Sequence, residues 1–254
     1  LRVHRFAHVA SPAAPSCRGA TAAGNTAGAR GQWYARAPAM ASPSSPRFAP
    51  LRRPNVGIAP EGAAHGEPIF RAGGLPLGLS PGVSMGLTDT ELGRFGALWV
   101  TGGGGESHAT QGLIRRALAA RVPLLATGEG LLLLNAALGG TTRDLPPGSG
   151  VTEHWQRHRP DQPQHPVDVR EGTLLAACVG RGNLMVNSTH RQTVDALGEG
   201  LAVSAVAPDG TVEAVELKTA SFALGVHWEP DRLLTALPLH RSLYEVLVGR
   251  ARER

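Results

Sequence analysis

From residue 55 onward, short apolar runs alternate with turns marked by Gly or Pro and with helical periodicities. Three short runs predict buried strands, at Asn55–Ala59, Ala97–Thr101 and Val122–Thr127. Apolar positions three and four residues apart predict helices over Gln111–Ala120 and Leu131–Leu138. Because strands and helices alternate here, we expect a parallel sheet with helices on both faces.

The second half of the chain has a different pattern, in which strands follow one another through short turns. The predicted strands are Val167–Val169, Leu184–Asn187, Leu201–Ala207, Val212–Leu217 and Phe222–Trp228. The Asp209-Gly210 turn predicts a hairpin between the third and fourth of them. A closing helix over Leu239–Arg252 is expected to cover an edge of the sheet.

The first 53 residues have no apolar periodicity and are rich in Ala, Pro, Ser, Gly and Arg, with no Asp or Glu. Such a segment buries too little apolar surface to offset the entropy of ordering it. We therefore divide the chain into a disordered tail, residues 1–53, and a folded domain, residues 54–254. The tail is similar in composition to a transit peptide; the alternative is sequence read through upstream of a start at Met40.

The formal charge of +5 and the isoelectric point near 10.2 come from this tail, which holds eight arginines. The domain holds the remaining 17 basic groups and 20 acidic ones, a net charge of −3. We therefore expect no nucleic-acid partner and, because no apolar run approaches a membrane span, no membrane partner. Cys17 and Cys178 form neither a disulfide framework nor a zinc set, which favours the cytoplasm. The sequence does not decide whether the protein forms a homodimer.

The segment LLAT-Gly128-Glu129-Gly130-LLLLN joins a buried strand to a helix through a sharp turn, the arrangement that presents a nucleophile. It resembles the elbow of the class I glutamine amidotransferase-like family, in its γ-glutamyl hydrolase branch (peptidase family C26, including γ-glutamyl-γ-aminobutyrate hydrolases). Other segments are similar to family motifs in the same order: Arg52–Pro60, Arg71–Pro76, Leu98–Gly103, Leu138–Pro146, His165–Val167, Val186–Gln192, Ala207–Ala214 and Phe222–Asp231.

The resemblance implies a three-layer, flavodoxin-like α/β domain with a central, mostly parallel sheet. It implies hydrolysis of the C–N bond of γ-glutamyl amides by a Cys-His-acid triad, with no cofactor and no metal. It also implies a pocket for a small γ-glutamyl-type ligand. The oxyanion and substrate-binding positions would be Gly102, Gly103, Glu129, Asn187, Ser188, His190 and His227.

The triad itself departs from the family pattern. Gly128 stands at the nucleophile position where the family has Cys, Glu229 stands at the His position, and Asp231 replaces the acid. Without a thiolate no acyl-enzyme forms, and without imidazole nothing transfers the proton. Glycine keeps the strained elbow shape while removing its chemistry. We therefore predict a catalytically impaired member of the family.

Three alternatives follow from the same residues. In the first, the chain binds or senses a γ-glutamyl-type ligand without hydrolysing it. In the second, His227 and Glu229, which are two residues apart on one strand face, activate a water molecule for hydrolysis. In the third, the chain is the product of a decaying gene and has no selected activity. Two shortened segments near the expected active-site mouth, Ala63–Phe70 and Gly104–Gln111, favour decay. A metal site formed by His190, His227 and Glu229 is a further alternative.

Other candidate residues have simpler interpretations. Cys178 follows an apolar run and is expected to be a core thiol. Thr127 should point away from the mouth. His154 and His158 have helical ligand spacing, but their loop predicts solvated side chains. The run Gly102–Gly105 lacks the Lys of a phosphate loop and is interpreted as a remnant of the oxyanion loop.

Overall fold

The computed structural model describes residues 52–60, 66–102, 107–145, 152–156, 158–218 and 222–254. The predicted tail therefore lies almost wholly outside the described residues, as do Gly103 and the first three residues, 104–106, of Gly104–Gln111. Among the described residues, no helix has the length and apolar character needed to cross a bilayer.

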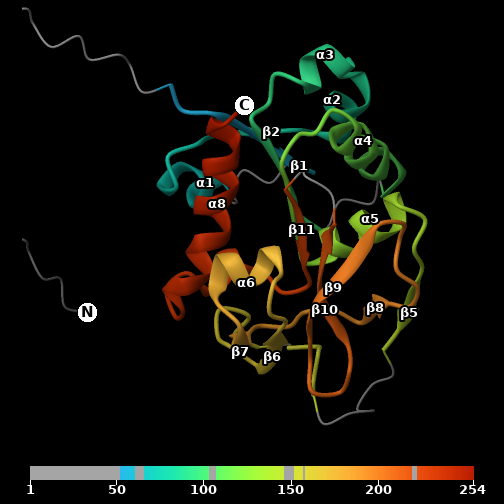
Figure 1. The fold of residues 1–254 in the computed structure, drawn as a ribbon, viewed down its shortest axis with the longest axis vertical. Helices are drawn as coiled ribbons and strands as arrows, with labels where there is room; N and C mark the ends of the chain where they lie inside the picture. Colours follow the sequence, from blue (N-terminus) through green and yellow to red (C-terminus); the bar gives the residue numbers. More distant parts are fainter. Residues whose placement is uncertain (1–51, 61–65, 103–106, 146–151, 157, 219–221) are drawn as a thin grey trace, which may run out of the picture. The chain divides into compact units, whose positions relative to one another are not determined.

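The described residues form a nine-stranded mixed sheet flanked by helices (Figure 1). In spatial order, its strands are β2 (Leu75–Gly78), β1 (Asn55–Ala59), β3 (Ala97–Val100), β4 (Leu124–Thr127), β11 (Ala223–Val226), β10 (Val212–Leu217), β9 (Leu201–Val206), β6 (His165–Val169) and β7 (Gly182–Val186). The first five are parallel and the other pairings are antiparallel. A separate antiparallel pair joins β5 (Thr142–Asp144) to β8 (Gln192–Val194).

Helices pack on both faces of the sheet. Their bounds are α1 (Gly66–Arg71), α2 (Pro81–Gly86), α3 (Asp89–Leu92), α4 (Ser107–Ala119), α5 (Glu129–Ala137), α6 (Leu174–Val179), α7 (Pro230–Leu233) and α8 (Arg241–Arg252), the last preceded by the 3₁₀ turn η2 (Pro238–His240). Figure 1 shows α8 and α6 on one side of the strands and α4 and α5 on the other. The predicted three-layer, flavodoxin-like α/β architecture is confirmed.

Strand alternation decides which side chain joins which layer. In β3, Leu98 and Val100 pack toward α4 and α5, whereas Trp99 packs toward α8 and meets Tyr244 edge-on at 4.9 Å. Thr127 lies on the same side as Trp99 and accepts a hydrogen bond from its indole N–H at 2.9 Å. Thr127 is buried and does not line the cleft at the elbow, so the prediction that it points away from the mouth is correct.

The closing helix was expected at an edge of the sheet, and this was wrong. Its apolar positions, Leu243, Tyr244, Leu247, Val248 and Ala251, form one stripe that is buried against β1, β3 and β4 in the parallel half. A stripe this wide buries more apolar surface on a sheet face than on a single edge strand. Most predicted strands and helices are present, with ends shifted by at most four residues, whereas β2, β5, β8 and the short helices α2, α3, α6 and α7 were not anticipated.

Candidate functional site

The turn between β4 and α5 has the backbone shape of a nucleophile elbow. Gly128 adopts φ 58° and ψ −129°, a conformation that side-chain-bearing residues rarely adopt. A Cβ placed there would meet Glu229 Cγ at 3.5 Å, ordinary van der Waals contact. The predicted nucleophile and histidine positions are therefore adjacent in space, although neither carries the expected residue.

Two further glycines allow the backbone to close around this turn. A Cβ at Gly130 would overlap the carbonyl oxygen of Val100, at the end of β3. A Cβ at Gly102 would overlap Glu129, the first residue of α5. The start of the presumed oxyanion loop therefore lies directly against the N-terminus of α5, where backbone N–H groups favour negative charge.

A cleft of about 550 Å³ opens at the elbow. Its lining combines predicted site residues with a rim from the β5 and β8 region: Gly102, Gly128, Glu129, Leu132, Asp144, Trp155, Thr189, His190, Arg191, Gln192, His227 and Glu229. On the rim, Gln192 donates a hydrogen bond to Asp144 at 2.9 Å, and the Arg191 guanidinium lies 4.1 Å from the Trp155 ring centre. The cleft thus offers carboxylates, an arginine and an aromatic surface.

Asn187 and Ser188, predicted to bind substrate, are completely buried and do not line the cleft. The Asn187 side chain instead accepts a hydrogen bond from the Glu229 backbone N–H at 3.0 Å and donates one to its carbonyl oxygen at 3.2 Å. The Ser188 hydroxyl donates to the carbonyl oxygen of His154 at 3.0 Å. Both residues position backbone around the cleft.

The carboxylate of Glu229 has partners other than the predicted His227. It accepts a hydrogen bond from the Thr189 hydroxyl at 3.0 Å and pairs with Arg232 at 2.9 Å. His227 instead stacks on His190, with ring centres 3.5 Å apart. The alternative in which His227 pairs with Glu229 is not realised because β11 ends at Val226, so strand alternation no longer applies to these two residues.

His227 is 1% exposed. Burial, together with the neighbouring His190, lowers the pKa of His227 to about 3, so its imidazole is neutral near pH 7. Asp231 lies in the first turn of α7 and does not line the cleft. Cys178 lies in α6, also outside the cleft, where burial raises the pKa of its thiol to about 11; no thiolate forms there at neutral pH.

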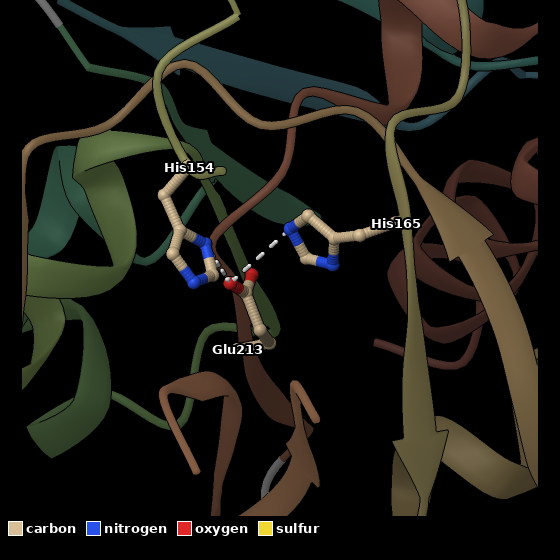
Figure 2. Close-up of side chains that lie close together, drawn as sticks. All are labelled: His154, His165 and Glu213. Atoms are coloured by element: carbon tan, nitrogen blue, oxygen red, sulfur yellow. Dashed lines mark ion pairs between the residues drawn. The ribbon is translucent and has the colours of Figure 1, made fainter. Parts of the chain in front are cut away.

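Beneath the cleft, histidines gather around the fully buried carboxylate of Glu213, in β10. The distances to Glu213 Oε1 are 3.1 Å from His154 Nδ1, 3.3 Å from His190 Nε2 and 3.8 Å from His165 Nε2. Figure 2 shows His154 and His165 with their rings directed at this carboxylate. The prediction that His154 is solvated was wrong, because its loop folds back over β10; His158 is exposed, as predicted.

The carboxylate and its neighbours shift one another's protonation. Complete burial opposes ionisation of Glu213, but the surrounding imidazoles outweigh it and hold its pKa below the ordinary value. Burial likewise opposes protonation of His154, yet Glu213 on one side and Asp209 on the other raise its pKa. Sequence reasoning noticed Glu213 only within a family motif. The sequence of β10 offered no specific signal, because Glu216 also stands between apolar residues in the same strand.

A half-parallel sheet with a strand–Gly–helix elbow at the carboxyl end of a central strand defines the class I glutamine amidotransferase fold. Solved structures agree: the glutaminase domain of Trypanosoma brucei CTPS has a TM-score of 0.63 at 15% identity, covering 79% of this chain and 94% of that one. A glutamine amidotransferase from Methylobacillus flagellatus has a TM-score of 0.57 at 17% identity, covering 80% and 95%. At these identities the likeness concerns the fold.

The chain belongs to the peptidase C26 family, whose model matches residues 106–231. It is 33% identical over 206 residues to the γ-glutamyl-γ-aminobutyrate hydrolase PuuD of Escherichia coli, covering 70% of this chain and 80% of that protein. It is 39% identical over 140 residues to Rv2859c of Mycobacterium tuberculosis, provisionally assigned as a glutamine amidotransferase. That match covers 55% of this chain and 45% of the mycobacterial protein. This homology places the chain in a family of C–N hydrolases.

Proposed function

We propose that this domain binds a γ-glutamyl-type ligand in the elbow cleft without hydrolysing it through an acyl-enzyme. The observation that carries the proposal is Gly128: the turn keeps φ 58°, yet the residue has no side chain to attack a carbonyl. Glu229, beside it, is engaged by Thr189 and Arg232. The site therefore keeps the shape of a hydrolase elbow and lacks its nucleophile.

The cleft lining supports a zwitterionic amino-acid ligand. A γ-glutamyl compound carries an α-carboxylate and an α-ammonium group. Arg191 supplies a planar donor for the carboxylate, and Asp144 supplies an acceptor for the ammonium group, both on the rim of the cleft. The E. coli relative is named for hydrolysis of a γ-glutamyl compound, which supports the same ligand class. A free thiol at Cys178 suits a reducing compartment, so we place this binding in the cytoplasm.

The test measures binding and turnover on the full chain. Calorimetry with L-glutamate and with γ-glutamyl-γ-aminobutyrate should show binding. Arg191→Ala should weaken it at least about tenfold, since a hydrogen bond to a charged group contributes about 1.5–3 kcal/mol. Arg115→Ala, an exposed position on α4, is the matched control and should leave the affinity unchanged. Absence of binding to either ligand by the unmodified chain contradicts the proposal.

Turnover is measured as glutamate release from γ-glutamyl amides. The unmodified chain should release none, and the Gly128→Cys, Glu229→His double variant should release it, because its two new side chains would be adjacent. Gly139→Cys, at another positive-φ glycine with open space around it, controls for an added thiol. Glutamate release by the unmodified chain would show that the site uses a different nucleophile and would overturn the non-catalytic assignment.

A further inference from the structure

A cluster of titratable side chains lies under the cleft and consists of Glu213, His154, His165, His190 and His227, of which His190 and His227 also line the cleft. Within it, one nitrogen each of His154 and His165 and a carboxylate oxygen of Glu213 all lie within 4.8 Å of one another, and all three residues are buried. These are two imidazole nitrogens and one carboxylate oxygen, a donor set that zinc accepts. Figure 2 shows both rings directed at the carboxylate.

The hydrogen bonds of His165 define which nitrogen carries its hydrogen. Its Nδ1 lies 3.0 Å from the backbone carbonyl oxygen of Pro166. A carbonyl can only accept, so Nδ1 is the donor. With its ring hydrogen on Nδ1, the imidazole has its free lone pair on Nε2. That lone pair is directed toward Glu213 Oε1, itself an acceptor, and Nε2 has no hydrogen-bond partner among the described residues.

His190 repeats this arrangement. Its Nδ1 lies 2.9 Å from the carbonyl oxygen of Gln192 and so carries a hydrogen. Its Nε2 lies 3.3 Å from Glu213 Oε1 and, like Nε2 of His165, has no hydrogen-bond partner among the described residues. Two buried nitrogens, Nε2 of His165 and Nε2 of His190, therefore face the same buried carboxylate oxygen at 3.8 and 3.3 Å.

In His154, the ring nitrogen that does not face Glu213 also has a hydrogen-bond partner. Nε2 lies 2.9 Å from Asp209 Oδ2. This carboxylate, which also accepts from the Thr211 backbone N–H at 3.0 Å, is the acceptor, so Nε2 of His154 is the donor. Nδ1 then faces Glu213. In metal centres, a coordinating histidine almost always donates its second N–H to a carboxylate or a backbone carbonyl. His154 and His165 each have that support.

We propose that His154 Nδ1, His165 Nε2 and the Glu213 carboxylate hold a divalent metal ion of the zinc class. Ligand bonds of about 2.0–2.1 Å in a tetrahedral zinc site imply separations between ligand atoms of about 3.3 Å. The separations from Glu213 Oε1, 3.1 and 3.8 Å, bracket this value. His190 Nε2, 3.3 Å from the same oxygen, is the nearest further donor. Binding displaces the proton that His154 otherwise shares with Glu213.

The position of this site gives it a structural role. Its ligands come from the loop before β6, the first residue of β6, and β10, so the ion joins segments distant in sequence. His190 belongs both to the cluster and to the cleft lining. The ion would therefore stabilise the floor of the cleft from below.

The first experiment removes bound metal from the full chain with a chelator and titrates it with Zn²⁺. We expect one equivalent to bind and the melting temperature to rise. Glu213→Gln and His165→Asn should each lower the affinity at least about tenfold, the loss typical even for residues that only support ligands. His158→Ala removes an exposed histidine four residues from His154 and is the matched control, expected to bind like the unmodified chain.

Cobalt provides a readout that does not depend on the variants folding. Co²⁺ bound to the unmodified chain should give the strong d–d absorption of a four-coordinate site with nitrogen and oxygen ligands, without a thiolate charge-transfer band. Less than a tenth of an equivalent of Zn²⁺ bound, a thiolate band, or full binding by both variants would each overturn the proposal. If less than a tenth of an equivalent of Zn²⁺ binds, the cluster binds protons and no metal ion.

Discussion

The backbone N–H of Gly128 donates a hydrogen bond to the carbonyl oxygen of Trp228 at 3.0 Å. This bond fastens the elbow after β4 to the segment after β11, the neighbouring parallel strand. Position 128 is thereby held beside Glu229 whatever side chains the two positions carry. The pairing of β4 with β11 therefore sets the distance between positions 128 and 229, and this distance does not depend on which residues occupy them.

Replacing Gly128 by Ala should destabilise the fold by about 1–3 kcal/mol, because φ 58° is strained for a residue with a Cβ. The nearest atom to the new Cβ would be 3.5 Å away, so the cost is conformational rather than steric. Urea unfolding measures it. Gly112→Ala, in helix α4 with open space around it, should instead stabilise by about 0.5–1 kcal/mol. Equal stability of Gly128→Ala and the unmodified chain would mean that the turn relaxes freely.

Replacement of Asn135 by Asp should strongly destabilise the fold. This fully buried side chain donates to the carbonyl oxygens of Thr141 and Ala196 at 3.1 and 3.0 Å and accepts from the Gly198 N–H at 2.8 Å. A carboxylate cannot donate, and it would be a buried charge facing two carbonyl oxygens. We expect Asn135→Asp to cost about 3 kcal/mol or more in the free energy of unfolding.

The control for Asn135→Asp is Asn55→Asp, an exposed site in β1, which should change stability by less than about 0.5 kcal/mol. The hydrogen bonds of Asn135 hold the segments next to β5 and β8, so the Asp variant should also lose ligand binding at the cleft. Unfolding curves that coincide for the two Asp variants would contradict this prediction.

His227 should make the protein less stable in mild acid. Its folded-state pKa, about 3, lies below the ordinary value of 6.5, so the unfolded chain takes up the proton first. The contribution of His227 to the free energy of unfolding is fully present above pH 6.5. It is lost as the pH falls toward 3, at about 1.4 kcal/mol per pH unit. His227→Gln should reduce this slope of unfolding free energy against pH by about one proton. Identical slopes for the variant and the unmodified chain would show that His227 is protonated in the fold.

Cys178 should react slowly with alkylating agents. Because burial raises its pKa to about 11, about one thiol in 1,000 is ionised at pH 8. We expect alkylation of the native chain to be roughly 100-fold slower than that of the urea-unfolded chain at this residue, measured by mass spectrometry of its peptide. Comparable rates in the two states would place Cys178 in a solvated environment.

The local pattern of apolar residues was sufficient to predict many strands of the sheet. The runs at Asn55–Ala59 and Val212–Leu217 are strands with the predicted ends, and each contains three or four consecutive buried residues, as expected of a strand covered on both faces. It failed for β5, whose three residues, Thr142–Asp144, are all exposed and form a strand only by pairing with β8. No local periodicity encodes such a pairing.

The residues of the elbow followed from the sequence, whereas the contacts of its neighbours did not. Pairing of Glu229 with His227 was one alternative because they lie two apart, but β11 ends at Val226 and the two residues have different partners. Asn187 was expected in the pocket and instead clamps the backbone of Glu229.

The sequence by itself determined that the elbow carries Gly where its family carries Cys, since covalent composition does not depend on folding. Through its apolar runs and their period it also determined the order of most strands and of the long helices α4, α5 and α8. Only the tertiary structure decided that histidines from separate loops meet at Glu213. Sheet order brings those loops together at the ends of β6, β10 and β11, and that order arises from contacts between residues distant in the chain.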